Sequence, residues 1–179
     1  MIIALDFDRT LFDTDRDLAL IRERGLEAKI GDPVVHTLVD PAPFLYDDVI
    51  PFFAKLSNTQ VPFVVSAVTE RYGPRSQAYQ RDKIVRAGVA AIVHDVILTG
   101  ESKVDALGKL VAAYPREEIV FVDDLADHLV AVRDALPRVH CIHMERAGAK
   151  RNSTILVPND MKTVHTLFEL LQELARITV

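Results

Sequence analysis

The stretch IIALDFDRTLFDTD, residues 2–15, decides the fold. Four apolar residues run directly into Asp6, and Asp8 and Thr10 follow in the next turn, so a buried strand should place a carboxylate at its own carboxyl end. An isolated buried charge costs several kcal/mol unless a cation or a proton meets it. The two acids therefore predict a metal ion or a bound proton at the end of the first strand.

The composition is that of an ordinary globular protein. Of 179 residues, 49% are hydrophobic and 26% are charged, which predicts one domain with a full core. The net charge of −5 argues against a general nucleic-acid binder. Cys141 is the only cysteine, so neither a disulfide framework nor a cysteine zinc site is available, and a cytoplasmic location is expected. No apolar run approaches the roughly 20 residues of a membrane helix, so no membrane partner is expected.

Apolar runs and amphipathic segments alternate along the rest of the chain. Strands are expected at about 61–65, 91–98, 119–122 and 139–143, and helices at about 16–28, 46–56, 74–87, 102–114 and 125–136. A terminal helix is expected with a buried face of Met161, Val164, Phe168, Leu171 and Leu174. The alternation predicts an α/β fold with a parallel sheet, helices on both faces, and ligands bound beyond the carboxyl ends of the strands.

Polar residues follow several of these strands. Ser66 closes the second strand, and Asp123 and Asp124 close the fourth, with Asp127 shortly after. Ser102 is predicted to cap the helix that follows the third strand, which puts Lys103 in the first turn, where the helix dipole disfavours a cation. A cation in that place indicates a partner of negative charge.

Taken in order, the turn Asp6-Phe-Asp8-Arg-Thr10, then Ser66, then Lys103, and then Asp123-Asp124-Leu-Ala-Asp127 resemble the four motifs of the haloacid dehalogenase-like (HAD) phosphohydrolase superfamily. The resemblance spans nearly the whole chain. It implies a Rossmann-like three-layer sandwich with a five-stranded parallel sheet in the order 5-4-1-2-3. It also implies a single core domain with a small helical cap inserted at about 14–44, after the first motif.

The resemblance implies a phosphatase that hydrolyses phosphate monoesters through an aspartyl-phosphate formed on Asp6. Asp8 would be the general acid and then the general base. Thr10 and Ser66 would donate hydrogen bonds to phosphoryl oxygens, and Lys103 would offset their negative charge.

The resemblance also implies Mg²⁺ as cofactor, because hard carboxylate oxygens suit it and it can bind phosphate oxygens at the same time. Its ligands would be the Asp6 side chain, the Asp8 backbone carbonyl and Asp123. A further acid would support the site, and the motif spacing ranks Asp127 first and Asp124 close behind.

Substrate contacts are less well defined by the sequence. Arg9 lies inside the catalytic turn and is the best-placed cation for an anionic substrate. The basic residues of the predicted helix at 74–87 and of the loop at 145–152 are expected to be solvated surface. They are Arg71, Arg75, Arg81, Lys83 and Arg86, and Arg146, Lys150 and Arg151. With only a small cap, the site should be fairly open to a macromolecular phosphate, to a small ester shielded by another subunit of a homo-oligomer, or to promiscuous hydrolysis.

Other functions remain open at this point. A phosphosugar mutase would use the same motifs. A receiver-like signalling domain also gathers acids, a hydroxyl and a lysine around Mg²⁺, but its phosphorylated aspartate follows a later strand. A non-catalytic phosphate-binding module is disfavoured, because no core motif residue is missing.

Overall fold

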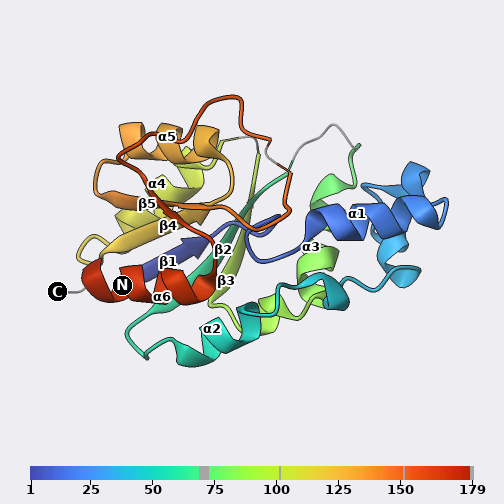
Figure 1. Ribbon diagram of the computed structural model, residues 1–179, viewed down its shortest axis with the longest axis horizontal. Coiled ribbons are helices and arrows are strands. Elements are labelled where there is room, and N and C mark those ends of the chain that lie inside the picture. Colours follow the sequence, from blue (N-terminus) through green and yellow to red (C-terminus); the bar gives the residue numbers. More distant parts are fainter. Residues whose placement is uncertain (69–72, 101, 151, 178–179) are drawn as a thin grey trace.

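The structure, a computed structural model, describes residues 1–68, 73–100, 102–150 and 152–177. A parallel sheet of six strands runs through its centre, in the order β3-β2-β1-β4-β5-β6 (Figure 1). The strands are β1 (Ile2–Leu5), β2 (Val61–Ala67), β3 (Asp95–Thr99), β4 (Ile119–Asp123), β5 (Val139–Met144) and β6 (Lys162–Val164). The predicted α/β class and the relative order of the first five strands are confirmed.

The sixth strand was not predicted. Lys162–Val164 pairs with Ile142–Met144, whereas the sequence placed Met161 and Val164 on the terminal helix. That helix, α6, spans Leu167–Ile177 and buries Leu167, Leu170 and Leu174, while Phe168 is 41% exposed. The prediction holds for Leu174, which is buried, and for Leu171, which is partly buried against the core. It was wrong for Met161 and Val164, because a strand of three residues is too short to show a period of its own.

Helices cover both faces of the sheet, as Figure 1 shows. α4 (Val104–Ala113) and α5 (Ala126–Ala135) pack on one face, and α2 (Val49–Lys55), α3 (Ser76–Arg86) and α6 pack on the other. The two resulting layers of core side chains leave β1 buried along its whole length. None of the described helices has the length and apolar character needed to cross a membrane.

The chain runs outward from β1 through β2 to β3 and then returns to β4 on the other side of β1. Such a reversal opens a crevice beyond the carboxyl ends of the two strands on either side of it. Leu5 is in register with Val122, so the residues that follow, Asp6 and Asp123, reach this crevice at the same level.

The segment 14–44 lies between β1 and α2 and contains α1 (Thr14–Glu23) followed by three short 3₁₀ helices, Glu27–Lys29, Pro33–Thr37 and Ala42–Phe44. Asp13 caps α1 by accepting a hydrogen bond from the Arg16 backbone N–H at 3.1 Å. The segment packs against α3: His36 Nδ1 lies 3.0 Å from Asp82, and Arg75 lies 2.7 Å from Asp32. We call residues 14–44 the insertion.

Candidate active site

Three carboxyl groups meet in the crevice between β1 and β4. Asp6, the first residue after β1, lies with Asp123 and Asp124 so that one oxygen of each falls within 4.8 Å of the others. The Asp6 backbone N–H donates to the Val122 carbonyl at 2.8 Å, which fixes the turn against β4. The first and fourth motifs are therefore brought together.

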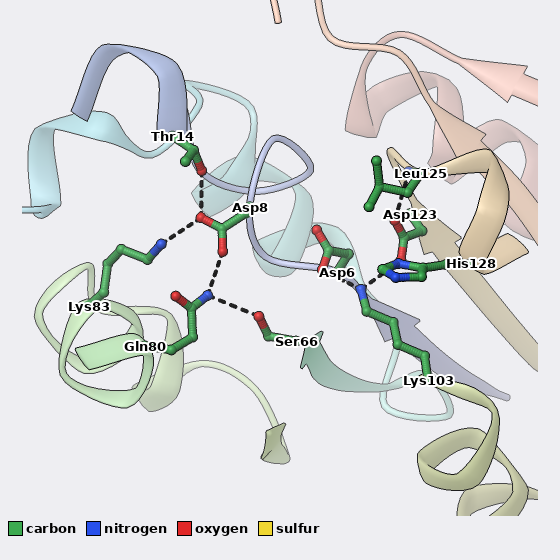
Figure 2. Close-up of polar contacts among 10 residues, drawn as sticks. All are labelled: Asp6, Asp8, Thr14, Ser66, Gln80, Lys83, Lys103, Asp123, Leu125 and His128. Atoms are coloured by element: carbon green, nitrogen blue, oxygen red, sulfur yellow. Dashed lines mark hydrogen bonds and ion pairs between the residues drawn. The ribbon is translucent and has the colours of Figure 1, made fainter. Parts of the chain in front are cut away.

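Lys103 is the cation of this carboxyl cluster. Its buried ammonium donates to Asp6 and, at 2.6 Å, to Asp123 (Figure 2). Burial by itself would lower the pKa of Lys103, but Asp123 and Asp6 raise it above its ordinary value. Lys103 occupies the N-cap position predicted for Ser102, whose hydroxyl still accepts from the Val104 N–H at 3.3 Å. The two carboxylates thus explain a cation at a helix start.

The carboxyl groups differ in their affinity for protons. Asp123 is held ionised, because Lys103 and His128, whose Nδ1 lies 3.0 Å away, lower its pKa although burial opposes this. Burial, together with the charges of Asp123 and Asp8, raises the pKa of Asp6 to about 7 against the effect of Lys103. Burial and the charges of Asp6 and Asp123 raise the pKa of Asp124 to about 9. The cluster is therefore short of positive charge.

A divalent cation fits this donor set. One lysine cannot neutralise three carboxylates, and hard oxygen donors are the ligands that Mg²⁺ prefers. The structure brings Asp124, and not Asp127, to the cluster. Asp127 instead accepts hydrogen bonds from the Thr154 hydroxyl and, at 2.8 Å, from the Thr154 backbone N–H. The ranking of Asp127 ahead of Asp124 does not agree with this geometry.

Asp8 belongs to a second polar cluster, on the side of the insertion. Its carboxylate accepts hydrogen bonds from Thr14, Lys83 and Gln80, each at 2.5 Å, as Figure 2 shows. The Gln80 amide also donates to Ser66 at 2.9 Å. Burial by itself would raise the pKa of Asp8, but the Lys83 ammonium and the three hydrogen bonds lower it below its ordinary value.

Thr14, Gln80 and Lys83, which bind Asp8, were not predicted from the sequence as residues of the site. The assignment of Lys83 to a solvated basic face was wrong, because its side chain is only 3% exposed. The available signal was its spacing, since Lys83 lies four residues from both Tyr79 and Ala87 on a face that α3 buries. Arg75, Arg81 and Arg86 are exposed as expected, and Arg71 and Arg151 lie outside the described residues.

Thr10 presents a hydroxyl suited to an incoming ligand. Its Oγ1 is buried and has no hydrogen-bond partner among the described residues. Its carbonyl accepts from Arg146 at 3.0 and 2.8 Å, and the same guanidinium binds Asp48 at 2.6 and 2.9 Å. Arg146 was expected on the solvated surface, but it is 6% exposed and holds the turn after β1 in place.

Arg9 lies at the entrance of the site. Its backbone has φ 58°, in the left-handed region that few non-glycine residues adopt, and its guanidinium binds Asp15 at 3.1 and 2.9 Å. It borders a cavity of about 440 Å³ between the insertion and the carboxyl edge of the sheet. This cavity is also lined by Asp8, Thr14, Leu18, Tyr79 and Lys83. Asp8 therefore faces the space that a bound molecule would fill.

Comparison with known proteins gives a fold but no close relative. No protein-family model and no curated protein matches the chain. A haloacid dehalogenase-like hydrolase of Burkholderia xenovorans superimposes with a TM-score of 0.71 at 19% identity, over 99% of this chain and 98% of that one. The magnesium-bound HAD-hydrolase YfnB of Bacillus subtilis gives 0.66 at 12% identity, over 97% of each chain. A haloacid dehalogenase-like hydrolase of Streptococcus pneumoniae gives 0.61 at 12% identity, again over 97% of each.

The chain therefore has the fold of the haloacid dehalogenase-like hydrolases. This confirms the fold that the four motifs implied, including its Rossmann-like three-layer arrangement. The six-stranded sheet corrects the expected number of strands.

Proposed function

We propose that the protein is a Mg²⁺-dependent phosphatase of the HAD superfamily that hydrolyses phosphate monoesters through an aspartyl-phosphate. The observation that carries the proposal is the meeting of Asp6, Asp123 and Asp124 around Lys103 in the β1/β4 crevice. The second acid, Asp8, lies two residues after Asp6 in the same turn and lines the cavity. The solved structures of the same fold support the assignment to hydrolases.

Asp6 is the nucleophile of this proposal. Its carboxylate oxygen attacks phosphorus, an oxygen–phosphorus bond forms, and the bond from phosphorus to the ester oxygen breaks. Asp8 gives its proton to the departing oxygen, and in the second step it takes a proton from the water that attacks the aspartyl-phosphate. The unpartnered hydroxyl of Thr10 and that of Ser66 orient the phosphoryl oxygens, and Lys103 offsets their charge.

The carboxylates of Asp6, Asp123 and Asp124 would hold the metal, together with the backbone carbonyl of Asp8. A bound Mg²⁺ supplies positive charge that lets an anionic phosphate approach the nucleophile. His128 and Lys103 keep Asp123 ionised and therefore ready to act as a ligand.

The proposal is tested by measuring release of inorganic phosphate from 4-nitrophenyl phosphate, with Mg²⁺ and with EDTA. Asp6→Asn should lose at least about a thousandfold in kcat, as removal of a covalent nucleophile commonly does. Asp134→Asn makes the same change of charge on the exposed surface of α5 and should leave the rate unchanged. Undiminished activity of Asp6→Asn would refute the proposal.

The same assay separates the rival functions. A phosphosugar mutase would transfer the phosphoryl group to a sugar phosphate and release little inorganic phosphate. A receiver-like domain would accumulate a stable phosphorylated form without turnover, and a non-catalytic binding module would do neither.

A further inference from the structure

The cavity of about 440 Å³ between the insertion and the sheet adjoins the place proposed for the phosphoryl group. Ser66, which the proposed mechanism places on a phosphoryl oxygen, accepts a hydrogen bond at 2.9 Å from Gln80, and Gln80 lines the cavity. Ala67, the last residue of β2, and Val68 follow Ser66 and also line it. Because the displacement at phosphorus is in line, the alcohol part of an ester bound at Asp6 extends away from Asp6. The cavity is the space that receives this alcohol.

Much of the cavity wall is apolar. Side chains from both the insertion and the core form this part, which we call the apolar wall: Leu18, Ile30, Val68, Tyr79 and Leu125. Leu18, Ile30 and Leu125 are only half-buried, so they still contact water. A bound apolar group would remove this surface from water, which is favourable in proportion to the area that is covered.

Leu18 is the residue of the apolar wall with the clearest relation to the first motif. It lies one helical turn after Thr14 on α1, and Thr14 donates its hydroxyl to Asp8 at 2.5 Å (Figure 2). With a rise of about 1.5 Å per residue, Leu18 begins about 6 Å further along α1 than Thr14 does. A ring joined to the phosphate through a short carbon chain spans such a distance.

The charged groups that border the cavity are paired within the protein. Asp8 binds the Lys83 ammonium at 2.5 Å, and His128 Nδ1 lies 3.0 Å from Asp123. Asp17, whose pKa burial raises to about 6, is fully buried on α1 and does not belong to the lining. A charged substrate group would therefore have to compete with a partner that is already present.

Arg9, the cation expected to meet an anionic substrate, has its charge balanced by a neighbouring acid. Its guanidinium donates to both oxygens of Asp15, at 3.1 and 2.9 Å, and both side chains are 16% exposed. In the orientation that satisfies its own hydrogen bonds, the Asn152 amide oxygen accepts from the guanidinium at 2.9 and 3.2 Å. Among the described residues, each cation that lines the cavity thus has a partner. A second anionic group on the substrate would lose its hydration without gaining a countercharge.

We propose that the substrates of this site are phosphate monoesters of uncharged, largely apolar alcohols, which pack against the apolar wall and carry the phosphate as their only charged group. The inference rests on the proposed phosphatase function and deepens it by naming the substrate class. The reaction is unchanged, since water and the ester give the alcohol and inorganic phosphate. A cavity of about 440 Å³ is within the usual range of small-molecule sites, roughly 300–1,000 Å³, so it admits a ring with a short carbon chain.

Three primary alkyl esters test the substrate class: ethyl phosphate, 2-phenylethyl phosphate and 2-(4-carboxyphenyl)ethyl phosphate. Their leaving oxygens are alike, so differences in kcat/KM report on the rest of the alcohol. Measured by release of inorganic phosphate with Mg²⁺, kcat/KM should rise about tenfold or more from the ethyl to the 2-phenylethyl ester. It should fall again by about tenfold or more when the ring carries a carboxylate.

Variants of Leu18 test whether the apolar wall causes this preference. Leu18→Ala should lower the ratio of kcat/KM for the 2-phenylethyl ester to that for the ethyl ester by about fivefold or more. Leu20→Ala makes the same change at another half-buried position of α1, outside this cavity, and should leave the ratio unchanged. Leu18→Lys adds a cation and should raise kcat/KM for the carboxylate ester relative to the 2-phenylethyl ester by about tenfold or more.

The wild-type comparison needs no variant, so it decides the question even if a Leu18 variant does not fold. The inference is overturned, and the phosphatase function stands, if the wild type hydrolyses 4-nitrophenyl phosphate but does not prefer the 2-phenylethyl ester to both of the others. It is also overturned if Leu18→Ala, folded and active, keeps the full preference for the ring. If the wild type hydrolyses none of these esters, the proposed function fails and the inference fails with it.

Discussion

The Lys83 ammonium lies 2.5 Å from the Asp8 carboxylate, although the two residues are 75 positions apart and come from different elements. This pair sets the charge of the second acid of the first motif. Asp6, the nucleophile of the proposed mechanism, is only two residues away and has its own cation in Lys103. Each lysine lowers the pKa of the acid that it binds, but the outcomes differ. The pKa of Asp8 lies below its ordinary value, whereas burial and the charges of Asp123 and Asp8 outweigh Lys103 and raise the pKa of Asp6 to about 7.

Replacing Lys83 should shift the pH dependence of the reaction. Lys83→Met removes the cation that lowers the pKa of Asp8, and burial then raises that pKa. A general acid works while it is protonated, so the descending limb of the kcat/KM profile for an alkyl phosphate should move to higher pH by about one unit. The profile of Arg81→Met, an exposed neighbour on α3, serves as control. Coincident profiles for Lys83→Met and the wild type would contradict this role.

Removing the Asp17 carboxylate should stabilise the protein above pH 6 and not below pH 4. The pKa of Asp17 is about 6 in the folded protein and 3.8 ordinarily, so between these values the folded chain binds the extra proton and loses stability as the pH rises. The loss amounts to about 3 kcal/mol above pH 6, from a difference of about two pKa units. Asp17→Asn avoids it, because the amide is neutral at every pH.

Urea unfolding of the two proteins at pH 4 and pH 7.5 measures this difference. Other titrating groups change the unfolding free energy of both proteins alike, so their contributions cancel in the difference between the two. An equal difference in stability at the two pH values would show that Asp17 does not titrate as described.

Arg146 should matter far more for stability than an exposed arginine does. Arg146→Leu leaves the buried Asp48 carboxylate and the Thr10 carbonyl without their donor, which should cost about 3 to 5 kcal/mol of unfolding free energy. Arg133 pairs with the exposed Asp160 at 3.3 Å, so Arg133→Leu should cost less than about 1 kcal/mol. Urea titrations of both variants test this contrast. Similar losses of unfolding free energy in the two variants would show that the hydrogen bonds of Arg146 to Thr10 and Asp48 do not stabilise the fold as described.

Asp124 and Asp127 should differ in metal binding. Asp124 lies in the carboxyl cluster, whereas Asp127 is engaged by Thr154, so Asp124→Asn should weaken Mg²⁺ binding by about tenfold or more and Asp127→Asn by less than about twofold. Isothermal titration calorimetry gives both values directly. Thermal unfolding with and without Mg²⁺ provides a second measurement, because an ion that binds only the folded state raises its Tm. A larger effect of Asp127→Asn would restore the ranking suggested by motif spacing.

The sequence was sufficient for the parts of the fold that depend on regular periods. The run before Asp6 and the run before Asp123 predicted two buried strands, and their parallel pairing brings the two acids together. β6 lacked such a signal, because Lys162–Val164 carries one buried residue and two polar ones. The short 3₁₀ helices of the insertion also lack a periodic signal, because they depend on local turns. In one of these turns the Asp32 side chain accepts a hydrogen bond from the Val34 N–H at 3.0 Å.

The residues of the four motifs could be predicted from the sequence, and the residues that support them, such as Lys83 and Arg146, could not. Lys83 and Arg146 resemble surface residues in the sequence, because nothing in their neighbouring residues shows that each pairs with a carboxylate from another segment. These partners are Asp8 and Asp48. Asp124 and Asp127 could not be separated either, because that choice depends on Thr154 in a loop about thirty residues away. Long-range electrostatic pairing leaves no periodic trace in a single sequence.

The contacts between the insertion and α3 have a consequence for how this protein could acquire new substrates. Asp32 of the insertion binds Arg75, the N-cap residue of α3, and His36 binds Asp82 within α3. The same helix carries Gln80 and Lys83, which bind Asp8. A change in the insertion that reshapes the cavity would therefore also displace Asp8, the general acid of the proposed mechanism. The substrate range and the environment of Asp8 would therefore change together. An attempt to give this protein the specificity of another would have to exchange residues 14–44 together with α3.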